Sequence, residues 1–124
     1  MKVTAEKNEK LANMVFGSIY PHYLNRIEKN GRTKEELDEV IRWFTGLDQD
    51  SLQNLIDEKA TYRRLFKEAS INPNAHLIKG VVCGYRIEAI EDEFELYRQC
   101  RQLEKLIDEL AKGRKMEKIL RKDK

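Results

Sequence analysis

The sequence predicts a mainly α fold, a compact bundle of five or six helices with one long C-terminal helix and a minor β-strand or hairpin. Apolar residues recur every three or four positions over most of the chain, as on a helix that buries one face. Residues that cap helices precede several of these segments. The composition of 124 residues, 40% hydrophobic and 37% charged, is that of one globular domain.

The first thirteen residues are polar, and we expect a frayed N-terminal segment ahead of a single helical domain over residues 14–124. The short apolar run at residues 14–16 predicts a brief strand or an extended lead-in to the first helix. Ser18 and Pro21 mark the start of the first helix, because proline is tolerated in a first turn where its missing N–H has no partner to lose.

A helix over residues 34–45 has the clearest start signal in the chain. Thr33 and Glu36 form a capping box, in which each side chain bonds the backbone N–H of the other. Gly46 ends the helix, since glycine adopts the left-handed conformation at no steric cost.

A second pair of helices follows. Asp48 caps a helix over residues 49–59, and Thr61 begins a continuation. Residues 34–59 therefore resemble a helix-turn-helix, but the second helix is acidic and would repel phosphates. An ordinary helical hairpin is the favoured interpretation.

The segment 77–90 is predicted to be extended or mixed, because its β-branched residues favour a strand while Gly80 and Gly84 discourage a helix. The same two glycines, four positions apart, would also suit a helix packed closely on a neighbour. A long helix is expected from Ile87 to Gly113, with acidic residues near its start that favour the helix dipole. Its apolar stripe suits intrachain packing or pairing with a second copy equally well. A short helix over residues 115–121 completes the bundle.

Four blocks of sequence carry a resemblance to a known family. They are Arg42-Trp43-Phe44-Thr45-Gly46, Asn72-Pro73-Asn74, Gly80-Val81-Val82-Cys83-Gly84-Tyr85-Arg86-Ile87-Glu88 and Asp108-Glu109-Leu110-Ala111-Lys112-Gly113. Together they resemble a family of short bacterial proteins known as domain of unknown function 2200. The resemblance implies a bacterial cytoplasmic protein and brings no activity with it.

The two cysteines, Cys83 and Cys100, are too few for a disulfide framework, and no signal peptide precedes the domain, so a reducing cytoplasm is expected. No apolar run is long enough for a membrane span. Neither paired metal ligands nor a phosphate-binding loop is present, and we expect no metal and no cofactor. Cys100 has core spacing on the long helix, whereas Cys83 lies between glycines.

Charge is distributed unevenly. From residue 112 onward there are seven basic residues against two acidic ones, while the rest of the chain has a net charge of −3. This basic tail is the first candidate surface for a partner. Its candidate residues are Lys112, Arg114, Lys115, Lys118, Arg121 and Lys122.

The leading hypothesis is a non-enzymatic interaction or regulatory protein that binds a protein partner, or itself, through helical surfaces and the basic tail. An alternative is a small enzyme or ligand-binding protein with a site around His76, Cys83, Tyr85 and Arg86, where reactive groups crowd a glycine-flanked segment. A third is sequence-independent binding of nucleic acid by the tail, which would be sensitive to salt.

Overall fold

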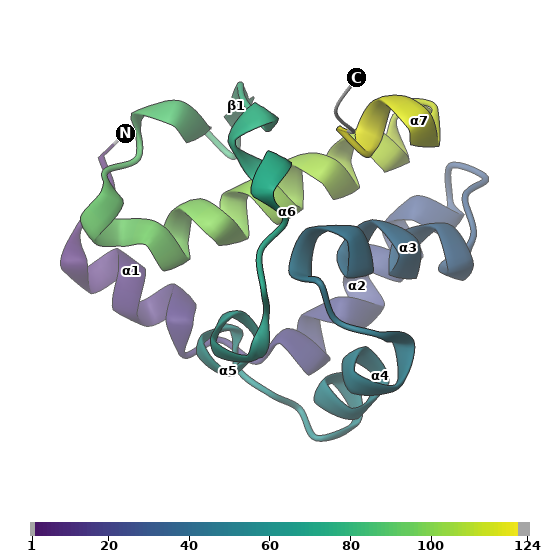
Figure 1. Cartoon of the computed structure of the whole chain (residues 1–124), viewed down its shortest axis with the longest axis horizontal. Coiled ribbons are helices and arrows are strands. Elements are labelled where there is room, and N and C mark those ends of the chain that lie inside the picture. Colours follow the sequence, from purple (N-terminus) through teal and green to yellow (C-terminus); the bar gives the residue numbers. More distant parts are fainter. Residues whose placement is uncertain (1, 122–124) are drawn as a thin grey trace.

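The computed structural model describes residues 2–121 and confirms the mainly α fold (Figure 1). The α-helices are α1 (Ala5–Ala12), α2 (Phe16–Glu28), α3 (Lys34–Thr45), α4 (Gln49–Asp57), α5 (Tyr62–Glu68), α6 (Glu95–Ala111) and α7 (Met116–Ile119). One hairpin joins β1 (Val81–Val82) to β2 (Tyr85–Arg86), and three 3₁₀ turns are η1 (Pro73–Leu77), η2 (Ile87–Ala89) and η3 (Asp92–Phe94).

The long helix α6 runs through the middle of the molecule, with α1 near its N-terminal end and α7 at its C-terminal end (Figure 1). It contacts α1, α2, α3, α5, α7 and β1. Its apolar stripe, including Tyr97, Cys100, Leu103 and Leu110, is buried within the chain. Intrachain packing therefore accounts for the stripe, which is not available for pairing with a second copy.

The predicted caps of the central helices are confirmed. Thr33 and Glu36 form the capping box, and Gly46 has a φ of 71°. Asp48 accepts from the N–H of Ser51 at 2.7 Å, and Thr61 caps α5 in the same way. The sequence predicts these caps well because each cap involves residues within four positions of one another.

The N-terminal segment forms a helix rather than the frayed end that its polarity suggested. Thr4 caps α1 by accepting from the N–H of Lys7, and Leu11 and Ala12 are buried. The Asn8 side chain accepts a hydrogen bond from the N–H of Tyr97 at 3.1 Å. It thereby caps the first turn of α6, whose own N-cap residue makes no side-chain bond, and this long-range contact leaves no local signal.

The helix α2 begins at Phe16, so Pro21 lies in its second turn and the predicted start was too late. The N–H groups of Phe16 and Gly17 both donate to the carbonyl of Ala60, which anchors the early start. A Cβ at Gly17 would lie 2.5 Å from the Ile56 carbonyl, so only glycine allows this approach. The strand expected at residues 14–16 is a single bridge between Val15 and Thr61.

The minor hairpin is confirmed, but the long helix begins at Glu95 and not at Ile87. Ile87 donates its N–H to the carbonyl of Gly80 at 2.9 Å, and Glu88 accepts from the N–H of Gly80 at 3.0 Å. These bonds fix the base of the hairpin and hold the next residues in 3₁₀ turns. A step of three apolar positions is shared by a 3₁₀ turn and an α-helix, which explains the error.

Candidate binding site

Tyr85 is shared by two hollows on the surface near the N-terminal end of α6. Tyr85 lines both a cavity of about 450 Å³ and a shallower groove of about 250 Å³. Three separate parts of the chain, α1 with the residues before it, the hairpin and α6, supply the charged and aromatic side chains. We call this the Tyr85 face, which consists of Lys2, Lys7, Lys10, Tyr85, Arg86, Tyr97 and Arg101.

The hairpin turn determines where Tyr85 points. Cys83 and Gly84 have φ values of 52° and 82°, the combination of positive φ values found in a type I′ turn. The two-residue turn pairs Val82 with Tyr85 in an antiparallel register. Because successive strand residues face opposite sides, Tyr85 is buried while Arg86 is exposed.

Cations and tyrosine rings form the wall of the groove. The Nζ of Lys7 lies 3.3 Å from the hydroxyl of Tyr85 and 5.8 Å from the centre of its ring. The Arg101 guanidinium lies 5.2 Å from the Tyr85 ring centre and 4.8 Å from that of Tyr97, and it donates to the Tyr97 hydroxyl at 2.8 Å. Both cations are therefore held by aromatic rings.

The electrostatics of the groove favour negative charge. The pKa of Tyr85 is lowered, most of all by hydrogen bonding with Tyr97. Lys7 lowers it further through its own hydrogen bond and its positive charge. Burial opposes the charge of Arg101, but its bonds to Tyr97 and Glu104 raise its pKa, so it stays a cation. The helix α1 contributes a third cation to the groove, the side chain of Lys10.

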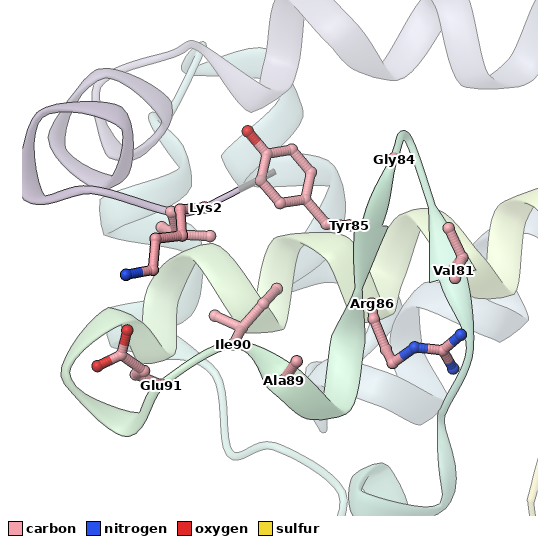
Figure 2. A pocket seen from close by; sticks show the side chains of 9 residues that line it. Lys2, Val81, Gly84, Tyr85, Arg86, Ala89, Ile90 and Glu91 are labelled. Atoms are coloured by element: carbon pink, nitrogen blue, oxygen red, sulfur yellow. The ribbon is translucent and has the colours of Figure 1, made fainter.

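The larger cavity has charges of both signs on its rim. Figure 2 shows Lys2 and Glu91 on one side, Arg86 on the other, and Ile90 between them. Val81 is 49% exposed beside it. This mixture of charges defines no single class of ligand.

The four residues predicted as a ligand site are only partly brought together. Tyr85 and Arg86 line the larger cavity. His76 lines a separate cavity of about 380 Å³, and its Nδ1 lies 2.8 Å from the Pro73 carbonyl oxygen. Cys83 lies in the hairpin turn with its sulfur 3.8 Å from the Glu104 carboxylate.

The two cysteines have different environments. Partial burial of the sulfur, followed by the charge of Glu104, raises the pKa of Cys83, which disfavours the thiolate. Cys100 is fully buried in the core, as its spacing predicted, and burial raises its pKa further. The free thiols are thus poor nucleophiles in this conformation.

Much of the basic tail is neutralised by carboxylates of α6. Glu109 is 7% exposed and forms ion pairs with Arg121 at 2.7 Å and with Arg114 at 3.0 Å. Asp108 pairs with Lys112 at 3.0 Å. These three predicted partner-binding bases also bind their own domain.

The bases of the tail that are both exposed and unpaired are fewer than the sequence count suggests. Lys115 and Lys118 are exposed at α7 and form no ion pair within residues 2–121. Lys122 lies outside the described residues. Ile119 and Leu120 are buried, so the apolar side of the tail packs on the domain itself.

Sequence reasoning missed Lys7, Lys10, Tyr97 and Arg101. The first two were assigned to a frayed segment, although Lys7, Leu11 and Met14 have helical spacing that could have revealed an amphipathic face. The other two are four residues apart on α6, and their relation to Tyr85 depends on the hairpin.

Across residues 2–121, no group of three His, Cys, Asp or Glu side chains is arranged to hold a metal ion. In the same part of the chain, no helix has the length and apolar character needed to cross a membrane.

The fold and sequence together define a bacterial protein family. The pattern of the family described as "Uncharacterized protein conserved in bacteria (DUF2200)" matches residues 10–121, and this chain belongs to that family. A solved structure, the crystal structure of uncharacterized protein SP1917, is similar, with 34% sequence identity and a TM-score of 0.84. The similarity covers 94% of this chain and 97% of that one. No curated protein matches the chain.

Proposed function

We propose that this protein is a cytoplasmic binding protein, without catalytic activity, that recognises its partner through the Tyr85 face. The observation that carries the proposal is the convergence of three chain segments on Tyr85, which lines two hollows of the surface. Clefts with an apolar lining and a few convergent polar groups are the usual form of a binding site.

The chemistry of the face supports binding over catalysis. Its most polar side chains are engaged with one another, since Arg101 donates to Tyr97 and Lys7 donates to Tyr85. The nearby thiol of Cys83 has a raised pKa, whereas a catalytic thiol needs a lowered one. His76 lies in a different cavity, and the carboxylate beside that thiol, Glu104, raises its pKa instead of favouring the thiolate.

The basic tail is a second candidate surface, for a protein partner or for nucleic acid. Lys115 and Lys118 favour it, since both are exposed and form no ion pair within residues 2–121. Because Arg114 and Arg121 pair with Glu109, the tail has less positive charge available for a partner than its sequence suggests. Self-association would use a surface other than the apolar stripe of α6, because that stripe is buried.

The test is native mass spectrometry of untagged protein purified gently from its own bacterial host. The wild type is compared with Lys7→Gln/Lys10→Gln, which alters the Tyr85 face, and with Lys115→Gln/Lys118→Gln, which alters the tail. Both double variants remove the same charge from exposed lysines. Each spectrum reports the protomer count and any retained mass.

We expect a retained mass in the wild type and in the tail variant, and its loss from the Lys7→Gln/Lys10→Gln variant. Loss from the tail variant alone would move the function to the tail. A wild-type protein that retains nothing and forms no dimer would contradict the proposal.

A further inference from the structure

The groove lined by Lys7, Lys10, Leu11, Met14, Tyr85, Tyr97 and Arg101 has one sign of charge. Its three charged side chains are all cations, and no carboxylate of residues 2–121 lines it. This separates it from the larger cavity, where Glu91 accompanies Lys2 and Arg86.

The three cations differ in the hydrogen bonds and ion pairs that they already form within the protein. Arg101 pairs with Glu104, and its side chain is 14% exposed. Lys7 contacts the carbonyl oxygen of Lys2 and the hydroxyl of Tyr85, both uncharged groups. Lys10 forms no hydrogen bond or ion pair with any residue of 2–121. The charges of the two lysines are therefore not matched by acids of the groove.

Aromatic contacts prearrange this positive charge. The Tyr85 and Tyr97 rings are packed edge to face with centres 5.3 Å apart, and Arg101 lies over both. Glu104 neutralises much of the charge of Arg101, whereas Lys7, held by the Tyr85 ring, keeps its charge. Binding an anion at Lys7 would therefore require little rearrangement and would break no ion pair among residues 2–121.

The rest of the groove is apolar. Leu11 is largely buried and Met14 is 41% exposed, so an apolar surface continues outward from the cations. The volume of about 250 Å³ falls just below the range of about 300–1,000 Å³ typical for drug-sized ligands. The shape suits a compact apolar body with one charged group.

We infer that the groove binds a small organic acid, with its anionic group between Lys7 and Lys10 and its apolar body against Leu11 and Met14. The inference rests on the proposed binding function and names the chemical class of the ligand. A carboxylate and a phosphate ester share the required charge, and the experiment separates them.

The probes are 2-naphthoate, 2-naphthyl phosphate and the neutral 2-naphthamide, titrated calorimetrically into the full chain. We expect one or both anions to bind saturably and the amide to bind about tenfold more weakly, because it lacks the charge-assisted bonds. Whichever anion binds more tightly identifies the preferred head group.

Two sets of variants locate the site. Lys7→Gln/Lys10→Gln should weaken binding of the anions about tenfold, and Lys115→Gln/Lys118→Gln should leave it unchanged. Met14→Asp places a carboxylate at the exposed apolar end of the groove and should weaken binding at least as much. Unchanged circular dichroism confirms that each variant is folded.

The inference is overturned if neither anion binds, if naphthamide binds as tightly, or if the Lys7→Gln/Lys10→Gln variant retains wild-type affinity. These results leave the native mass spectra untouched, so a partner retained through the Tyr85 face would still support the proposed function. Conversely, naphthoate binding without any retained mass would support the groove and contradict the wider proposal.

Discussion

The two ends of α6 both gather basic side chains, but they balance them differently. At the C-terminal end, the buried carboxylate of Glu109 pairs with Arg114 and Arg121. At the N-terminal end, Glu104 pairs with Arg101, but Lys7 lies against the Tyr85 ring and neither Lys7 nor Lys10 pairs with an acid of residues 2–121. A run of bases in a sequence therefore shows how much charge is present, and the acids near it in space decide how much is available.

The largest predicted effect is the removal of the carboxylate that ties the tail to α6. Glu109→Gln leaves Arg121, whose side chain is 14% exposed, without its anionic partner. We expect the free energy of unfolding to fall by about 3 kcal/mol, because a largely buried guanidinium is left uncompensated. Urea denaturation measures the loss as a lower midpoint at constant slope.

The matched control is Glu117→Gln, which removes the same charge from an exposed position on α7. It should change stability by less than about 0.5 kcal/mol. Equal midpoints for the Glu109 and Glu117 variants would show that the tail charges are solvated at both positions, and the comparison between the two ends would fail.

The next effect concerns the N-terminal end, where Asn8 caps α6 from another helix. Asn8→Ala removes the acceptor for the N–H of Tyr97 and should reduce stability by about 1 kcal/mol. Asn25→Ala is the control, since Asn25 is an exposed residue inside α2 and gains the same helix propensity. A smaller loss for Asn8→Ala than for Asn25→Ala would exclude this capping role.

The two ends should also respond differently to acid. Partial burial opposes the charge of Asp108, but Lys112 and Arg26 outweigh it and lower its pKa below the ordinary value of 3.8. A lowered folded-state pKa contributes stability above the unfolded-state value, and that contribution is lost as the pH falls through the folded-state value. Acid therefore loosens the C-terminal end.

Asp108→Asn should lower the free energy of unfolding by about 1 kcal/mol near neutral pH, a modest loss because its partners Arg26 and Lys112 are exposed. Below about pH 4 the variant should lose less further stability than the wild type, because it has no carboxylate to protonate at this position. Thermal unfolding of both proteins between pH 2 and pH 7 measures the difference. Parallel curves over that range would remove Asp108 as the source of acid sensitivity at this end.

The sequence predicted best what depends on neighbouring residues. The capping box at Thr33, the Gly46 terminus and the burial of Cys100 follow from spacings within one helix. The ordered helix α1 and the late start of α6 did not follow, because each depends on bonds between distant segments. Asn8 meets Tyr97, and Ile87 meets Gly80, only after the chain has folded.

The candidate site was predicted in part for the same reason. The glycine-flanked segment predicted Tyr85 and Arg86 as site residues, and both line the larger cavity. Lys7 and Lys10 carry no motif, and their importance comes from lying beside Tyr85. When three distant segments together form a cluster of charge, no sequence pattern within a single segment predicts it.

The smallest predicted effect tests the tail as a nucleic-acid surface. Lys115→Gln/Lys118→Gln should change stability by less than about 0.5 kcal/mol, because both side chains are exposed. If single-stranded DNA contacts these two lysines, the slope of log affinity against log salt concentration should fall in magnitude by about 1.4 in the variant. We expect no such change, since Glu109 and Asp108 already neutralise the neighbouring bases. Fluorescence anisotropy of a labelled oligonucleotide at several salt concentrations measures the slope, and a fall of that size would restore the tail as the principal binding surface.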